Sequence, residues 1–177
     1  MKHPNLFQSY TFNNGVTVSN RLAVAPMTHL ASDDNGHITA EERQFLTNRF
    51  RGIGLFISAA TLVHEGGKAF YGQPEAIGPE DLPSLREVAH IAHDQGAKAL
   101  LQIHHGGWQS IPELNPNGEI FAPSEHPETG AKALTEAQIL SIIDGYGRAA
   151  ELALEAGFDG VEIHGANNYL IQQFFSA

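Results

Sequence analysis

The stretch Gly157-Phe158-Asp159-Gly160-Val161-Glu162-Ile163-His164 decides the fold of this chain. Gly157 follows a long helical pattern and is typical of the residue just after a helix, where the backbone needs a positive φ angle. The largely apolar run from Gly160 to His164 comes next and predicts a buried strand. Reading outward toward the N-terminus, similar runs predict three further strands, at Leu22–Ala25, Leu55–Ala60 and Ala97–Ile103.

Helical patterns separate these strands. Thr39-Ala40-Glu41-Glu42 is a capping box, and it predicts a helix that runs to about Arg51. A second helix ends at Gly96, and its inner face carries Leu85, Val88, Ala89 and Ala92. Another capping box at Thr135 opens a third helix, whose apolar stripe is Ile139, Ile142, Ile143, Tyr146, Ala150 and Ala153. Strands and helices therefore alternate along most of the chain.

The order β-α-β-α-β-α-β predicts a parallel sheet with right-handed crossovers. Ahead of it, Tyr10–Val18 predicts a β-hairpin, because Asn14-Gly15 supplies the positive φ angles of a tight two-residue turn. Both a doubly wound sheet and a (β/α)8 barrel have this order. The glycine fingerprint of dinucleotide-binding folds is missing after the first strand, where Pro26-Met27-Thr28 stands, and there is no P-loop.

Polar residues on the strands favour the barrel. Gln102 and His104 share one face of the third strand, and Glu162 and His164 share one face of the fourth. Without partners, each buried polar group would cost about 1–3 kcal/mol, so this face is expected to line a polar site. A whole barrel takes about 250 residues, and this chain has 177. We expect a single domain over residues 1–177, namely an N-terminal hairpin followed by the first four units of a barrel.

Composition excludes several classes of function. The chain has 10 Lys and Arg against 20 Asp and Glu, a net charge of −10, so nucleic acid and anionic membranes are not expected as partners. It has no Cys, which excludes disulfides, thiolate nucleophiles and iron–sulfur clusters from these residues. No apolar run reaches the roughly 18 residues of a membrane-spanning helix. A cytoplasmic protein is the expectation.

The densest polar cluster is His164-Gly165-Ala166-Asn167-Asn168-Tyr169, at the end of the fourth strand. His164 and Asn167 could donate two hydrogen bonds to one substrate oxygen, with Tyr169 nearby as a proton donor. The alternative is a capped helix start, with Asn167 or Asn168 as the N-cap. Spacing alone does not choose between these two interpretations.

Residues at the ends of the other strands suggest a flat ligand. Pro26-Met27-Thr28 could lay amides and a hydroxyl along its edge, or could be a plain strand-ending turn with Met27 in the core. Ala60 leaves room for a planar ring or suits tight packing. Gln102 offers the donor and acceptor pair that a uracil-like edge requires, or is a satisfied core glutamine. His64, His104 and His164 are the candidate ligands of a metal site, although their spacing matches no zinc motif.

Taken together, these segments resemble the Old Yellow Enzyme family of FMN-dependent ene-reductases, the NADH:flavin oxidoreductases. The resemblance runs in order along nearly the whole chain. It rests on Asn20-Arg21, Ala25-Pro26-Met27-Thr28, Ala60, Gln102, His105-Gly106-Gly107, Ala122-Pro123-Ser124, the block from Ala156 to Asn167, and Tyr169-Leu170.

The resemblance implies a role for each matching residue. Ala25, Pro26, Met27, Thr28, Ala60 and Gln102 would bind FMN, with Thr28 tuning the flavin and Gln102 bonded to its pyrimidine portion. His164 and Asn167 would hold a substrate carbonyl. Tyr169 would protonate the α-carbon of an activated alkene after hydride, taken from NAD(P)H, reaches the β-carbon. The implied substrates are small alkenes such as α,β-unsaturated carbonyls, or quinone-like molecules, and no metal is implied.

Two departures accompany the resemblance. Asn168 stands where the family commonly has Gly, which affects the turn that aims Tyr169. The loops that bind phosphate after the last strands of many barrels have no counterpart here. We therefore expect a truncated fragment of an ene-reductase that forms homo-oligomers. The alternatives are a self-associating half-barrel that is not an enzyme and lacks FMN, and a metal-dependent barrel hydrolase.

Overall fold

The computed structural model describes residues 2–176 and begins with a short 3₁₀ helix, Pro4–Phe7, and a β-hairpin. Strands β1 (Tyr10–Thr11) and β2 (Thr17–Val18) pair in antiparallel fashion, as predicted. The predicted two-residue turn is wrong. Three residues form the loop, since the Phe12 N–H donates to the Val16 carbonyl, and only Gly15 has a positive φ angle (88°). The Asn14 side chain instead accepts a hydrogen bond from the Val16 N–H.

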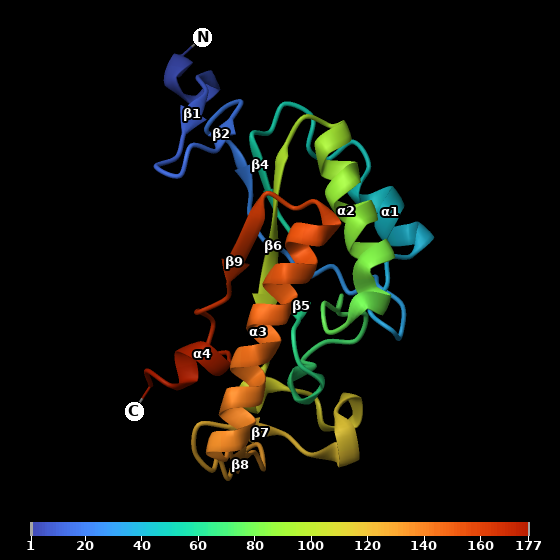
Figure 1. Ribbon diagram of the computed structural model, residues 1–177, viewed down its shortest axis with the longest axis vertical. Coiled ribbons are helices and arrows are strands. Elements are labelled where there is room, and N and C mark those ends of the chain that lie inside the picture. Colours follow the sequence, from blue (N-terminus) through green and yellow to red (C-terminus); the bar gives the residue numbers. More distant parts are fainter. Residues whose placement is uncertain (1, 177) are drawn as a thin grey trace.

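A parallel sheet follows, as predicted, in which β3 lies beside β4 and β4 beside β6 (Figure 1). Its members are β3 (Ala23–Val24), β4 (Leu55–Ile57), β5 (Thr61–Leu62), β6 (Lys98–His104) and β9 (Gly160–Ile163). Strands β4 and β5 both pair with one edge of β6, while β9 pairs with its other edge. The sheet thus has four neighbouring positions, which is the arrangement of half a (β/α)8 barrel.

The second predicted strand, Leu55–Ala60, is interrupted, which corrects its expected length. The Ser58 N–H still donates to the Leu100 carbonyl of β6. The regular pattern stops there because the Ser58 hydroxyl accepts the hydrogen bond from the Gln102 N–H and itself donates to the Ala59 carbonyl. Pairing with β6 resumes at Thr61, which lies opposite Ile103. The break displaces Ala60 from the regular sheet and leaves it at the edge where the carboxyl ends of the strands meet.

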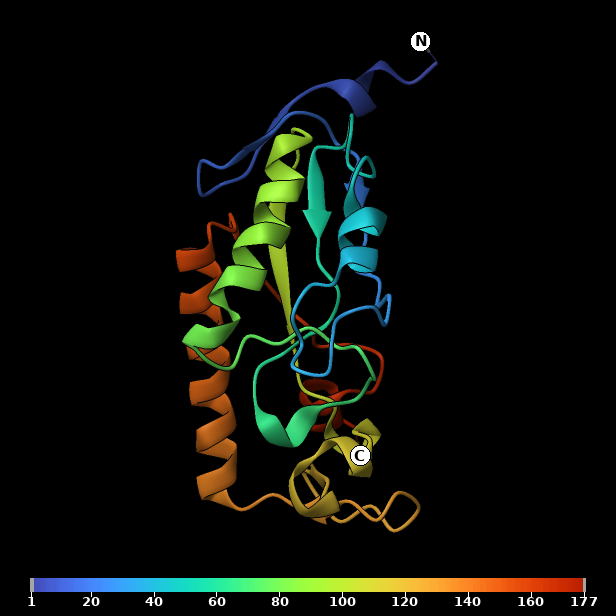
Figure 2. The same ribbon diagram turned by 90° about the vertical axis from the view of Figure 1, so that its right-hand side faces the viewer.

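Three helices cover one face of the sheet (Figure 2): α1 (Ala40–Leu46), α2 (Leu82–Asp94) and α3 (Glu136–Ala156). Helix α3 has the predicted ends, a reciprocal capping box at Thr135 and Gly157 in the left-handed conformation. Helix α1 is shorter than predicted. It stops at Leu46 because the Gln95 side chain donates to the Leu46 carbonyl and accepts from the Phe50 N–H.

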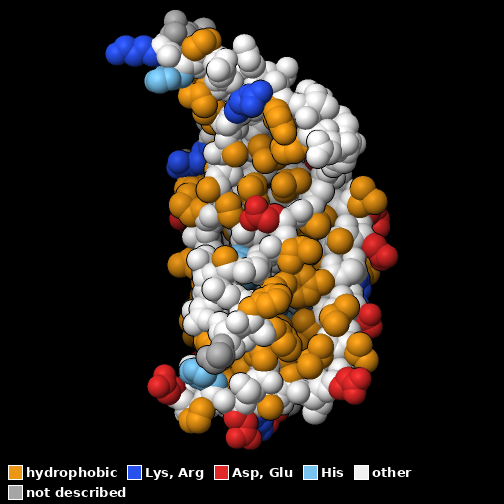
Figure 3. Space-filling model, turned by 90° about the vertical axis from the view of Figure 1, so that its left-hand side faces the viewer, with side chains coloured by type: hydrophobic (Ala, Val, Ile, Leu, Met, Phe, Trp, Pro, Cys, Tyr) orange, Lys and Arg blue, Asp and Glu red, His pale blue; other side chains and the backbone are white. Residues whose placement is uncertain are grey.

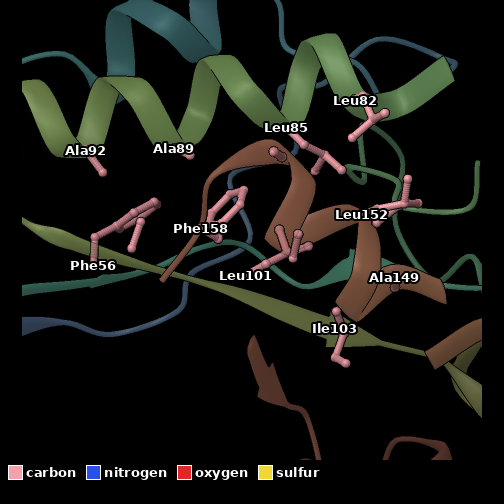
Figure 4. Close-up of a cluster of buried hydrophobic side chains, with 14 of the residues drawn as sticks. Phe56, Leu82, Leu85, Ala89, Ala92, Leu101, Ile103, Ala149, Leu152 and Phe158 are labelled. Atoms are coloured by element: carbon pink, nitrogen blue, oxygen red, sulfur yellow. The ribbon is translucent and has the colours of Figure 1, made fainter. Parts of the chain in front are cut away.

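The hydrophobic core lies between the sheet and these helices (Figure 4). Phe56 of β4 and Leu101 of β6 face Ala89 and Ala92 of α2, and Phe158 lies between Phe56 and Leu101. Burial of a Phe or Leu side chain contributes about 1.5–3 kcal/mol, so these contacts hold helix against strand. Among residues 2–176 no helix is long and apolar enough to cross a membrane.

Apart from a helix start after the fourth predicted strand, the remaining elements were not predicted. The short 3₁₀ helices Glu65–Gly67 and Pro79–Asp81 lie in the connection from β5 to α2. Three more, Gly107–Gln109, Pro112–Leu114 and Pro116–Gly118, follow β6. They lead to a small parallel pair, β7 (Phe121–Ala122) and β8 (Lys132–Ala133). After β9 the chain forms α4 (Leu170–Gln173). These segments surround the carboxyl ends of the strands, where the candidate site lies.

Candidate active site

A pocket of about 470 Å³ opens at the carboxyl ends of the strands. Each predicted strand supplies part of its wall, as expected for strands that end at one edge of a sheet. The lining residues are Pro26, Thr28, Ala60, Phe70, Gln102, Glu162, Ile163, His164, Gly165, Ala166, Asn167 and Tyr169. The structure therefore brings seven of the nine predicted site residues to one cavity: Pro26, Thr28, Ala60, Gln102, His164, Asn167 and Tyr169.

Ala25 and Met27 do not line this pocket. Both contribute instead to a neighbouring cavity of about 300 Å³, together with His29 and Phe45. Side chains alternate along an extended segment, which is why Ala25 and Met27 face away from the side that Pro26 and Thr28 line. Met27 is 57% exposed, so the alternative interpretation that placed it in the core is wrong.

His164 is held by a tight turn at the end of β9. Its Nδ1 accepts a hydrogen bond from the Ala166 N–H at 3.3 Å, which places the ring proton on Nε2. Burial is the main cause that lowers the pKa of His164, although Glu162 acts in the opposite direction. A neutral ring with a proton on Nε2 is a hydrogen-bond donor, and Nε2 has no protein partner among the described residues. Such a group suits a substrate oxygen.

The loop after His164 contains two consecutive residues in the left-handed conformation, Asn167 (φ 55°) and Asn168 (φ 63°). The Gln109 side chain donates to the carbonyls of both, at 2.9 and 2.8 Å. Gln173 also donates to the Asn168 carbonyl, at 2.7 Å. Neither Asn caps α4, whose N-cap is Tyr169 without a side-chain hydrogen bond, so the capped-helix alternative is wrong. The side chains of Gln109, which follows β6, and of Gln173 in α4 therefore hold the backbone of this loop.

Tyr169 lies among three other aromatic rings. Its ring meets His104, His164 and Phe70 edge to face, with centroids 4.4, 5.0 and 6.0 Å apart. Burial raises the pKa of Tyr169 above that of a free phenol, so the hydroxyl keeps its proton at neutral pH. The phenol is thus a proton donor held in a defined direction beside His164.

The structure also assigns supporting residues that the sequence analysis missed. Gln73, fully buried, accepts a hydrogen bond from the Ala69 N–H and donates to both the Ala60 carbonyl and His104 Nδ1. Burial is the largest cause that lowers the pKa of His104 to about 3. No local pattern marks Gln73 or Phe70, because both lie in an irregular connection and their partners are far away in sequence.

The described residues contain no group of three His, Cys, Asp or Glu side chains that could hold a metal ion. His64 lies in a different cavity, and both of its ring nitrogens are engaged, Nδ1 with the Gly66 N–H and Nε2 with Ser141. His104 is buried behind the pocket wall, and its Nδ1 accepts a hydrogen bond from the Gln73 side chain. The three histidines proposed for a metal-dependent hydrolase are therefore not brought together.

These features define a class: half of a parallel β/α barrel with neutral donors and a proton-bearing phenol around a pocket at the carboxyl ends of its strands. The sequence matches the model of the NADH:flavin oxidoreductase / NADH oxidase family over residues 5–177, and the chain belongs to this family. Members of the family are FMN-dependent oxidoreductases with a nicotinamide as reductant.

Two curated relatives and one solved structure illustrate the match. A probable NADH-dependent flavin oxidoreductase, YqiG of Bacillus subtilis (strain 168), is 47% identical over 99% of this chain and 48% of its own length. A probable flavin mononucleotide-dependent alkene reductase of Leishmania infantum is 35% identical over 90% of this chain and 49% of its own. The Old Yellow Enzyme from Pichia sp. AKU4542 shares the fold, with a TM-score of 0.88 at 24% identity over 98% of this chain and 49% of its own. The chain spans about half the length of the curated relatives it matches.

Proposed function

We propose that residues 1–177 form the N-terminal half of the FMN-binding barrel of an ene-reductase, an enzyme that transfers hydride from NAD(P)H through the flavin to activated alkenes such as α,β-unsaturated carbonyls. One observation carries this proposal. The neutral donors His164 and Asn167 and the protonated phenol of Tyr169 line the same pocket as the small side chain of Ala60 and the amide of Gln102. Relatives named for flavin-dependent reduction of alkenes support the choice of substrate class.

The pocket suits the flat ring of a flavin. Its volume of about 470 Å³ is within the range of about 300–1,000 Å³ typical of cofactor sites. Thr28 and Gln102 would bond the polar edge of the ring, and Pro26 and Ala60 would pack against it. Bound FMN would supply the hydride carrier that none of these side chains provides. Ala25 and Met27 would act through their backbone, because their side chains point elsewhere.

Three residues in the segment that follows β9 would bind and protonate the substrate. His164 and Asn167 would donate hydrogen bonds to the carbonyl oxygen of the substrate, which withdraws electron density from the conjugated alkene. Tyr169 would donate its proton to the α-carbon. Because this phenol is held beside His164, one bound molecule could contact both groups at once.

The phosphate of FMN has no evident partner in this half. No Lys or Arg side chain lines the pocket among the described residues, and the chain carries a net charge of −10. We therefore propose that the flavin ring is the main group recognised by this chain. A self-associating half-barrel without FMN is the second candidate, because a large apolar groove lies open beside α3. The cytoplasmic location and the homo-oligomeric state stay predictions.

Flavin binding by the purified chain tests the proposal. We expect lumiflavin, which has the ring without the ribityl phosphate, to bind with an affinity within a few-fold of that of FMN, as measured by fluorescence quenching. Thr28→Ala and Gln102→Leu should weaken both ligands, whereas His64→Ala, in a different cavity, should weaken neither. Absence of binding for both ligands would favour the self-associating half-barrel.

A further inference from the structure

Glu162 lines the pocket, yet the proposed function gives it no role. We propose that Glu162 is a positioning residue: its carboxylate fixes the side-chain amide of Gln102 so that the amide oxygen is presented to the ligand as an acceptor. This inference rests on the proposed function in its choice of ligand, a ring with an N–H between two carbonyl groups. The orientation of the Gln102 amide does not depend on the proposed function, because it is set by contacts within the chain.

Sheet register places the two side chains together. Strands β6 and β9 pair in parallel from Leu100 opposite Gly160 to Ile103 opposite Ile163, which sets Gln102 opposite Glu162. Directly paired residues of adjacent strands point to the same face of a sheet, so both side chains are directed toward the pocket. Gln102 Nε2 donates to Glu162 Oε1 at 2.7 Å, the length of a strong charge-assisted bond.

The chemistry of a carboxylate determines which way the amide faces. An ionised carboxylate only accepts hydrogen bonds, so Gln102 must turn its NH₂ group toward Glu162. The flipped amide would bring two oxygens to 2.7 Å without a proton between them. The Gln102 backbone is also held, since its N–H donates to the Ser58 hydroxyl at 2.9 Å. Side chain and main chain are thus both restrained.

The restraint leaves one acceptor free. Gln102 is only 5% exposed, but its Oε1 has no hydrogen bond to any other described residue. Glu162 likewise forms no ion pair within residues 2–176, so the Gln102 amide is its hydrogen-bond partner in the structure. The outcome is an amide oxygen that faces a ligand N–H. An imide edge presents acceptor, donor and acceptor in sequence, and only this amide orientation gives the central N–H a partner.

Selectivity between two small flavins measures this effect. Lumiflavin carries the imide N–H, and 3-methyllumiflavin replaces that hydrogen with a methyl group. We expect the wild-type chain to prefer lumiflavin by about tenfold, the ratio that one well-formed hydrogen bond provides. In Glu162→Gln, which has the same shape, the new amide at position 162 can donate to Gln102 as well as accept from it. In Glu162→Leu, position 162 offers no hydrogen-bond partner to Gln102. We expect the preference to fall in both variants, toward equal binding in Glu162→Leu.

Glu151→Gln, an exposed position on α3, is the matched control and should keep the wild-type ratio. Circular dichroism of each variant verifies folding, and a ratio of affinities is insensitive to a uniform loss of folded protein. A wild-type ratio in Glu162→Gln and Glu162→Leu, or equal binding of the two ligands by wild type, overturns the proposal.

The side-chain amide resonances of Gln102, assigned with Gln102→Leu, test the orientation without any flavin. In the wild-type chain we expect one NH₂ proton to be shifted downfield by the Glu162 carboxylate, and this shift to disappear in Glu162→Leu. Identical Gln102 amide signals in wild type and Glu162→Leu overturn the inference. If no flavin binds, the flavin site is refuted for this chain, while these NMR signals still decide the role of Glu162.

Discussion

At the scale of single residues, three histidines at strand ends adopt the same local turn. In each, Nδ1 accepts the backbone N–H two residues later, the pairs being His64 with Gly66, His105 with Gly107, and His164 with Ala166. The turn places the ring proton on Nε2 and needs only a following segment that bends back on itself. Of the three rings, only that of His164 faces the candidate active site. The turn determines which ring nitrogen carries the proton, and the position of the histidine in the barrel determines whether that nitrogen faces the active site.

This tautomer leads to a prediction for His164→Ala. A hydrogen bond from the ring to a phenolate is worth about 1.5–3 kcal/mol, so loss of the ring should weaken binding of a phenolic ligand by one to two orders of magnitude. Titration of a flavin-loaded protein with a phenol, followed by absorbance, provides the measurement. His64→Ala removes a ring with the same turn in another cavity and should change nothing. Equal affinity in His164→Ala and wild type would refute the assignment.

Tyr169→Phe separates proton transfer from hydride transfer. The phenol is a protonated donor beside His164, and its removal leaves the ring packing against His104 and Phe70 in place. In a flavin-loaded protein we expect reduction by NAD(P)H to proceed at nearly the wild-type rate and reoxidation by an enone to slow strongly. Stopped-flow absorbance resolves the two half-reactions. If both slow equally, Tyr169 has a structural role only.

The buried histidines make the folded state sensitive to acid. Burial lowers the pKa values of His104 and His105 to about 3, against 6.5 in an unfolded chain. Between these two values the unfolded state binds a proton that the folded state does not, so the free energy of unfolding falls as the pH falls from about 6.5 toward about 3. Each histidine should cost roughly 2 kcal/mol between pH 7 and pH 5. Urea titrations at several pH values measure this slope, and His105→Gln should reduce it by about one proton.

At the scale of elements, the loop from His164 to Tyr169 determines where the active groups point. Asn168 occupies the left-handed region with φ 63°, and only its backbone atoms form hydrogen bonds among the described residues. Gly suits this conformation best, and Asn is among the side chains that tolerate it. This explains why Asn168 can stand at the position where the Old Yellow Enzyme family commonly has Gly.

Substitution at Asn168 isolates this backbone conformation. We expect Asn168→Gly to raise the free energy of unfolding by up to about 1 kcal/mol and Asn168→Val to lower it by more than about 1 kcal/mol, since a β-branched residue is strained there. Urea unfolding followed by circular dichroism measures both. Equal stabilities for the two variants would show that the loop relaxes to another conformation.

Elements whose limits depend on neighbouring residues could be predicted from the sequence. The ends of α3 follow from Thr135 and Gly157, which act on adjacent turns of the same helix. The early end of α1 could not be predicted, because Gln95, far along the chain, competes for its last carbonyl. The interruption of the second strand at Ser58 likewise depends on a hydrogen bond to another strand.

The same distinction holds for the candidate site. Gln102 lies on β6 and His164 directly follows β9, so alternation of side chains indicated that they face one cavity, and the structure brings them there. Gln73 and Gln109 lie outside the sheet and contact site residues that are 31 and 58 positions away in sequence. Their roles depend on how irregular segments pack, and no local pattern encodes that.

At the scale of the whole molecule, the half-barrel leaves apolar surface uncovered. A wholly apolar groove of about 420 Å³ runs between α3, β9 and α4, and hydrophobic side chains gather on this side of the molecule (Figure 3). Ile143, Ile163 and Phe175 in its walls are 58%, 61% and 85% exposed. The outer edges of β3 and β9 pair with no other strand of the described residues. Monomeric proteins rarely expose such a surface together with free strand edges.

We therefore predict that the chain, produced alone, associates with other copies of itself and holds FMN weakly. Apolar burial favours association, whereas the charge of −10 on each copy opposes it, so added salt should shift the equilibrium toward larger species. Ile143→Glu, which places a charge in the groove, should return the chain toward monomer, whereas Leu140→Glu, exposed on the same helix but outside the groove, should not. Size-exclusion chromatography with light scattering and an in-line absorbance spectrum measures mass and bound flavin together. A monomer at all salt concentrations that carries one FMN per chain would refute this prediction, because it would mean that these residues alone cover the groove and hold the phosphate.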